Sequence, residues 1–137
     1  MRATLIQNAD EHHWMLLDYR VTQLLIDPGS FRLQSWSLEG SVEIRFGAPF
    51  SLISARGGER RLDPEQTEAL APVLALLRRP LQSITVSRDG ELAVEFSDGV
   101  SLRAAPHPRY EAWEVQGAGA LEGMSYQCDV GGGSPWG

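Results

Sequence analysis

The chain has 137 residues, of which 42% are hydrophobic and 22% are charged, and its formal net charge is −6. This composition is that of one globular domain with a real core, and it excludes a disordered chain or a membrane-spanning one. All basic residues are arginine, so lysine nucleophiles and P-loop lysines are excluded, and the acidic balance argues against binding nucleic acid.

The N-terminal stretch MRATLIQNADEHHWMLLDYR has no apolar core of the kind found in signal peptides. We therefore expect a cytoplasmic protein that does not bind membranes. His12 and His13 are neighbours, and neighbouring side chains on an extended chain point apart. They are predicted to be surface histidines rather than a pair of metal ligands.

Residues 19–54 are predicted to form a first β-meander. Short runs rich in β-branched and aromatic residues alternate there with the turn signals DPGS (27–30) and LEGS (38–41), and ARGGER (55–60) follows. Such spacing is typical of antiparallel hairpins.

A helix is predicted over residues 63–79. Asp63 is a suitable N-cap, Pro64 suits the first helical position, and Pro80 ends the segment. Pro72 predicts a kink or two short helices, 64–71 and 72–78. An apolar stripe suited to packing on a sheet consists of Leu70, Val73, Leu74 and Leu77.

Residues 81–128 are predicted to form a second meander. Leu92, Val94 and Phe96 alternate with polar or small residues, which predicts a strand with one buried face. The two meanders also match each other at an offset of about 60 residues, with Trp36 over Phe96 and Gly40 over Gly99. Either an internal duplication or the shared pattern of all meanders explains this match.

These elements predict an α+β fold in a single domain, 1–137, made mainly of antiparallel sheet from the two related β-meanders with one helix between them. The sheet would form one curved layer, a sandwich or a partial barrel. The glycine-rich tail, 129–137, is predicted to be flexible.

The stretch PHPRYEAWEVQG, residues 106–117, concentrates the chain's reactive side chains. Strand alternation places Trp113 and Val115 together in the core, and it separates Glu111 from Glu114, so a glycosidase-type carboxylate pair is not expected. The stretch is either an amphipathic edge strand or a binding surface.

No other catalytic or cofactor pattern is recognised. Cys128 is the single cysteine, and it is predicted to be a buried structural residue, although a thiol–imidazole couple with His107 stays open. HExxH, GxSxG and GxGxxG motifs are absent, so no cofactor and no metal are predicted.

The chain resembles a family of small, uncharacterised bacterial proteins. The resemblance rests on ELAVEFSDGVSLRAAPHPRYEAWEVQG, with YEAWE (110–114) as its specific part, and on the tail VGGGSPWG, which lacks the usual proline before the glycines. The resemblance implies no activity, and some relatives look like immunity proteins, which bind and neutralise a toxin.

We therefore predict a non-enzymatic protein-interaction module, with an immunity-like role as its narrower form. The predicted surface consists of His107, Tyr110, Glu111 and Glu114, with Trp36 and Trp136 as aromatic anchors. Its acidic character suits a basic protein partner, and exposed strand edges would allow a homodimer. Two alternatives are a small-ligand-binding protein with a pocket in the curved sheet and an enzyme that uses His107 or Glu111.

Overall fold

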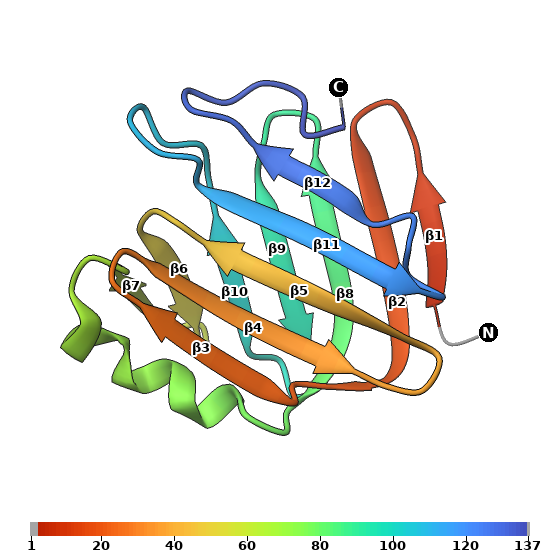
Figure 1. Cartoon of the computed structure of the whole chain (residues 1–137), viewed down its shortest axis with the longest axis horizontal. Helices are drawn as coiled ribbons and strands as arrows, with labels where there is room; N and C mark the ends of the chain where they lie inside the picture. The colour runs from red at the N-terminus through yellow and green to blue at the C-terminus, as the bar shows by residue number, and fades with distance from the viewer. Residues whose placement is uncertain (1–2, 137) are drawn as a thin grey trace.

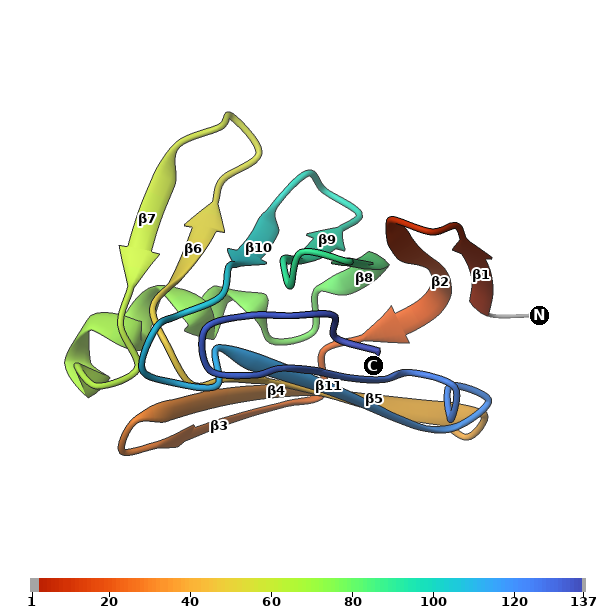
Figure 2. The ribbon, with the colours of Figure 1, turned by 90° about the horizontal axis from the view of Figure 1, so that it is seen from above.

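Two antiparallel β-sheets packed face to face make up the protein (Figures 1 and 2). The structure, a computed structural model, describes residues 3–136. The seven-stranded large sheet has the spatial order β1 (Ala3–Gln7), β2 (Glu11–Arg20), β8 (Pro80–Ser87), β9 (Leu92–Phe96), β10 (Ser101–Ala104), β6 (Phe50–Ile53), β7 (Glu59–Leu62). The five-stranded small sheet has the order β12 (Ser125–Cys128), β11 (Trp113–Gly119), β5 (Gly40–Phe46), β4 (Ser30–Trp36), β3 (Gln23–Asp27).

The prediction of an α+β fold is wrong, because the predicted helix over 63–79 is a short 3₁₀ segment, η1 (Thr67–Leu76). The sandwich is better described as all-β. Asp63 does not cap a helix; its carboxylate and carbonyl accept the N–H groups of Glu65 and Gln66 at 3.0 and 2.9 Å and so form a turn. Pro72 lies inside η1. It has no N–H for the hydrogen bond of an α-helix, and its ring would clash with the preceding helical turn.

The 3₁₀ geometry also changes which side chains of this segment reach the core. Leu70, Val73 and Leu76 are buried, at a spacing of three residues, whereas Leu74 and Leu77 of the predicted stripe are exposed. A 3₁₀ helix has three residues per turn, so every third side chain lies on the same face.

The core lies between the two sheets and consists of the apolar side chains that alternate along the strands. The predicted inward set Leu92, Val94 and Phe96 is buried, which confirms the period of two in β9. Phe46 of the small sheet stacks on Phe50 of the large sheet with ring centroids 4.5 Å apart. Such ring contacts add to the burial of apolar surface that joins the two sheets.

The two predicted meanders are not separate units, because each one contributes strands to both sheets. β3, β4 and β5 lie in the small sheet, and the next strand, β6, crosses to the large sheet and pairs with β10. β8, β9 and β10 lie in the large sheet, and the next strand, β11, crosses to the small sheet and pairs with β5. The orders β8-β9-β10-β6-β7 and β3-β4-β5-β11-β12 therefore have the same connectivity, with β1 and β2 added at one edge.

The large sheet has two strands more than the small one, and it curls away from the small sheet at its two margins (Figure 2). One margin is the β6–β7 hairpin, beneath which η1 lies. The other is the β1–β2 hairpin, which lies beside the C-terminal segment (Figure 1). This curvature makes the outer face of the large sheet concave.

Trp113 joins the two sheets, and its replacement should weaken the fold. Its indole is fully buried in the small sheet, and Nε1 donates to the carbonyl of Gly90 at 2.8 Å, in the turn that follows β8. Trp113→Phe should lower the free energy of unfolding by about 2–3 kcal/mol, because it leaves a cavity and a buried carbonyl without this donor. Chemical denaturation measures the change. Trp36→Phe is the matched control at an exposed position, and an equal loss in both variants would contradict the assignment.

Gly117 should not tolerate a side chain. Its N–H donates to the carbonyl of Met124 at 2.7 Å, and a Cβ at this position would overlap the backbone carbonyl oxygen of Leu121. Gly117→Ala should therefore destabilise the fold by about 3 kcal/mol, measured by thermal or chemical unfolding. Gly123→Ala is the control, since a Cβ there would meet Trp14 at an ordinary 3.4 Å. Equal stability of the two variants would show that the loop after β11 adapts freely.

Candidate functional site

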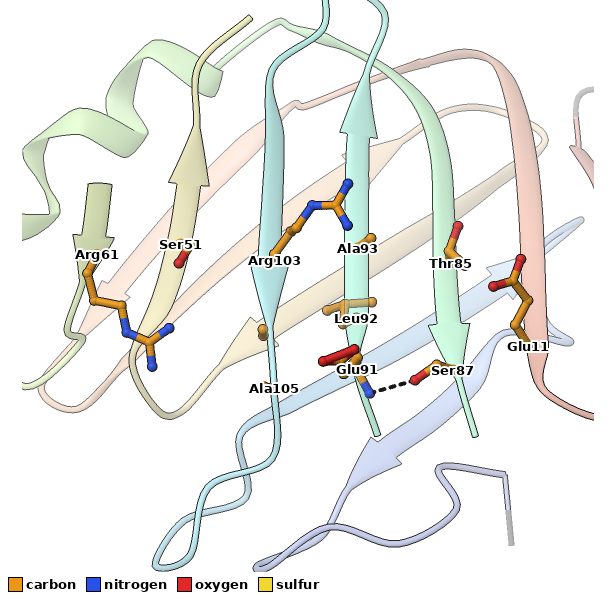
Figure 3. A pocket seen from close by; sticks show the side chains of 11 residues that line it. Glu11, Ser51, Arg61, Thr85, Ser87, Glu91, Leu92, Ala93, Arg103 and Ala105 are labelled. Atoms are coloured by element: carbon orange, nitrogen blue, oxygen red, sulfur yellow. Dashed lines mark hydrogen bonds between the residues drawn. The ribbon is translucent and has the colours of Figure 1, made fainter. Parts of the chain in front are cut away.

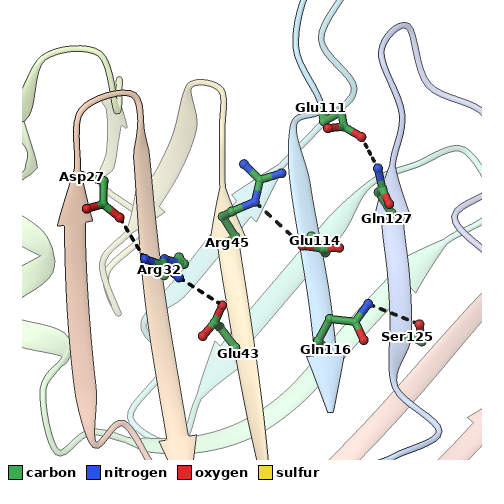
Figure 4. A network of polar contacts seen from close by, with 9 residues as sticks. All are labelled: Asp27, Arg32, Glu43, Arg45, Glu111, Glu114, Gln116, Ser125 and Gln127. Atoms are coloured by element: carbon green, nitrogen blue, oxygen red, sulfur yellow. Dashed lines mark hydrogen bonds and ion pairs between the residues drawn. The ribbon is translucent and has the colours of Figure 1, made fainter.

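The outer face of the small sheet is a ladder of paired polar side chains (Figure 4). Arg32 on β4 contacts Asp27 at 2.9 Å and Glu43 at 3.7 Å, and Arg45 on β5 contacts Glu114 at 3.8 Å. Gln116 donates to Ser125 at 3.3 Å, and Gln127 donates to Glu111. Most charges on this face are thus engaged across neighbouring strands.

Three of the six predicted surface residues lie together in the loop between β10 and β11. The rings of His107 and Tyr110 are 4.9 Å apart, and His107 Nδ1 accepts the N–H of Arg109 at 3.0 Å. The Glu111 carboxylate points to β12, where it accepts the hydrogen bond from Gln127 (Figure 4). The functional role of these residues stays a prediction.

The other three predicted residues lie outside this loop. Glu114 is on β11 within the paired ladder, opposite Gln127, which bonds Glu111, so the prediction that strand alternation separates the two carboxylates is wrong. Trp36 is 62% exposed and lies at the end of β4. It pairs with Ser41 at the start of β5, whereas Gly47 follows the other end of β5. Gly47 donates to the carbonyl of Ala112 beside the predicted loop, so Trp36 is about 20 Å from that loop along the strand.

Trp136 belongs to an aromatic cluster on the β2 margin of the large sheet. Its ring stacks on His12 with centroids 3.9 Å apart and an interplanar angle of 9°. The Tyr126 hydroxyl accepts the indole N–H of Trp14 at 2.9 Å, and it shares a second hydrogen bond of 2.8 Å with His12 Nδ1. Burial lowers the pKa of His12 and raises that of Tyr126. The C-terminal segment thereby covers the inner face of β2.

Cys128 is fully buried, as predicted for a structural thiol. Burial raises its pKa, whereas an activated cysteine nucleophile needs a lowered one. Its thiol lies 3.8 Å from the carbonyl of Asp129. The geometry therefore gives no support to a thiol–imidazole couple with His107.

The concave outer face of the large sheet is the feature that sequence reasoning missed. One cross-strand row on this face follows the strand registers from β2 to β7: His13, Thr85, Ala93, Arg103, Ser51, Arg61. Ser83 and Ser101 lie in the next row, on either side of Glu95, and are buried although they face outward. We call this surface the trough; its floor is formed by the small side chains of Ser51, Ser83, Thr85, Ala93 and Ser101.

Unpaired charges stand around a hollow of about 310 Å³ in the trough (Figure 3). Arg103 and Arg61 reach it from β10 and β7, and Glu11 and Glu91 reach it from β2 and the start of β9. None of these four side chains forms an ion pair or hydrogen bond with residues 3–136. The hydrogen bond drawn in this region comes from the backbone: the Glu91 N–H donates to Ser87 Oγ at 3.0 Å. The trough thus differs from the paired ladder on the opposite face.

A sequence signal for the trough exists, but it is weak. The segments SITVS, LAVEF and SLRA alternate buried apolar residues with small or charged ones. This pattern predicts a buried face, and it does not distinguish an ordinary solvated face from a concave one.

Lowering the pH should reduce the free energy of unfolding, because His12 becomes protonated. Because burial lowers the pKa of His12 below the value of about 6.5 in the unfolded chain, its contribution is fully present above that value and is lost as pH falls through the folded pKa. The unfolding free energy should therefore decrease from about pH 7.5 to about pH 5.5 less steeply in His12→Phe, which keeps a ring on Trp136, than in the original protein. Urea unfolding at both pH values measures this difference, and parallel changes in the two proteins would rule out His12 as its source.

Comparison with known proteins gives a family and no activity. No curated protein and no solved structure matches the chain. Within residues 3–136 no helix has the length and apolar character needed to cross a lipid bilayer. The model of a family of unknown function, DUF6188, matches residues 16–132, which include β3 to β12 and the second half of β2. The chain therefore belongs to this family of unknown function.

Proposed function

We propose that the protein is a non-enzymatic protein-interaction module and that the trough is its binding surface. The observation that carries this proposal is the set of charged side chains without partners above a floor of small residues. Unpaired arginines and carboxylates on a folded surface are free to form ion pairs with a partner, and such pairs contribute to specificity and to the rate of association.

The width of the trough suits a polypeptide segment better than a small molecule. The row from His13 on β2 to Arg61 on β7 crosses six neighbouring strands of the large sheet. At about 4.8 Å between strands this is about 24 Å, the length of roughly seven residues of extended chain. The floor also carries the hydroxyl groups of Ser51 and Thr85, whereas small-molecule pockets are lined mostly by apolar side chains.

The arrangement of charge specifies the chemistry of the partner. Arg103 and Arg61 lie toward the β7 side, Glu11 lies on the β2 side, and Glu91 lies between them at the lower end of β9 (Figure 3). A segment with basic residues at one end and acidic residues at the other would pair with both groups. The basic part of such a partner would pair with the carboxylates, and its acidic part would pair with the arginines.

An immunity-like role, in which the module neutralises a toxin by binding it, is the narrower form of this proposal. It is supported by the family resemblance of the YEAWE segment and by the exposed charges of the trough. A homodimer through a free strand edge is compatible with it, since β1, β7, β3 and β12 are edge strands.

Affinity capture with matched charge variants tests the proposal. The tagged protein is used to capture partners from a lysate of the cells that encode it, beside the variants Arg61→Ala/Arg103→Ala and Arg32→Ala/Arg45→Ala. Both variants remove two arginines, the first from the trough and the second from the paired ladder. We expect the trough variant to retain about a tenth or less of the specific partner and the ladder variant to capture it normally.

A third variant separates the trough from the loop surface predicted from the sequence. Loss of the partner in Tyr110→Ala/Glu111→Ala, with normal capture by the trough variant, would move the binding surface to the β10–β11 loop. Equal capture by all variants would show that neither surface binds a partner.

A further inference from the structure

A second hollow, of about 470 Å³, lies between η1 and the β6–β7 hairpin, and we call it the cleft. It is on the inner side of the large sheet, so the sheet itself separates it from the trough. The β6–β7 hairpin turns away from the small sheet and η1 lies beneath it (Figure 2), and residues of both line the cleft.

The walls of the cleft are mainly apolar. Leu52 on β6 and Val100 before β10 lie on one side, and Leu76, Ala75 and Pro72 of η1 lie on the other. Leu76 is buried, and Leu52 and Val100 are partly exposed to solvent at the edge of the core. Apolar surface that is left in contact with water gains free energy when a ligand covers it.

The cleft has one available charge, the guanidinium of Arg60. Arg60 forms no ion pair or hydrogen bond with residues 3–136, whereas Arg79, the other arginine of the cleft, is paired with Asp98. Glu59 contributes to the wall, but its carboxylate is held by the Ser51 hydroxyl at 2.6 Å. Because Ser51 belongs to the trough, this carboxylate is turned to the opposite face of the sheet.

We propose that the cleft binds a small amphipathic carboxylic acid. Its apolar body would lie against Leu52, Leu76 and Val100, and its carboxylate would pair with Arg60, whose planar guanidinium suits a bidentate contact. The volume lies within the range of about 300–1,000 Å³ that small-ligand sites occupy. This site is independent of the trough, since Arg60 and Arg61 are consecutive on β7 and point to opposite faces.

Calorimetric titration with decanoate as the probe tests the site. The original protein should bind one decanoate with a Kd on the order of 10–100 μM. Arg60→Gln should weaken this binding about tenfold, and decanol, which lacks the charge, should bind the original protein about tenfold more weakly than decanoate. The matched control, Arg61→Gln, removes the same charge from the neighbouring residue on the trough side and should bind decanoate normally.

A space-filling variant tests the apolar wall separately. Ala75→Trp keeps Arg60 and places a bulky ring in the cleft, so decanoate binding should be lost while thermal unfolding is unchanged. The proposal is overturned if decanoate does not bind, if Arg60→Gln and Arg61→Gln weaken binding equally, or if Ala75→Trp binds normally. Loss of partner capture in the trough variant leaves these results unaffected, so the two sites can fail independently.

Discussion

The chain crosses between the two sheets at β6 and again at β11: β6 follows strands of the small sheet and pairs in the large one, and β11 follows strands of the large sheet and pairs in the small one. These two crossings tie the sheets together covalently, and the pairs β5–β11 and β10–β6 then join the two halves of the chain within each sheet. Separating the two halves of the chain would therefore require breaking both pairs as well as exposing the core. Phe46 and Phe50, on either side of the first crossing, stack in that core, and Trp113, which follows the second crossing, is bonded to the other sheet.

Both proposed binding sites follow from the unequal size of the two sheets. A seven-stranded sheet cannot be covered by a five-stranded one, so its margins need other cover. η1 covers the β6–β7 margin, and the segment ending in Trp136 covers β2 by stacking on His12. The margins curl away from the small sheet, which hollows the outer face into the trough. Incomplete cover by η1 leaves the cleft on the inner side.

The two outer faces differ in how their charges are used. On the small sheet, Arg32 and Arg45 are engaged by carboxylates on neighbouring strands, and such exposed pairs contribute little to stability but leave few charges free for a partner. On the large sheet, the small residues of the trough floor separate Arg103 from Glu11, and Arg103 forms no ion pair among residues 3–136. Separation of charge by small side chains is what keeps this face available for binding.

The sequence by itself determined the strands and which side of each one is buried, because a period of two is a local property of an extended chain. The alternation of side chains also placed Trp113 and Val115 in the core. His107 and Tyr110 were expected to be neighbours because they are three residues apart in the chain. The sequence did not distinguish α from 3₁₀ geometry around Pro72, where packing selected Leu76 over Leu77. Only the tertiary structure decided which strands pair, that Trp136 stacks on His12 while Trp36 lies at the far end of β4, and that Ser51, Thr85 and Arg103 share one concave face. Those relations depend on contacts between distant parts of the chain and on the curvature of the assembled sheet, and neither leaves a local pattern in the sequence.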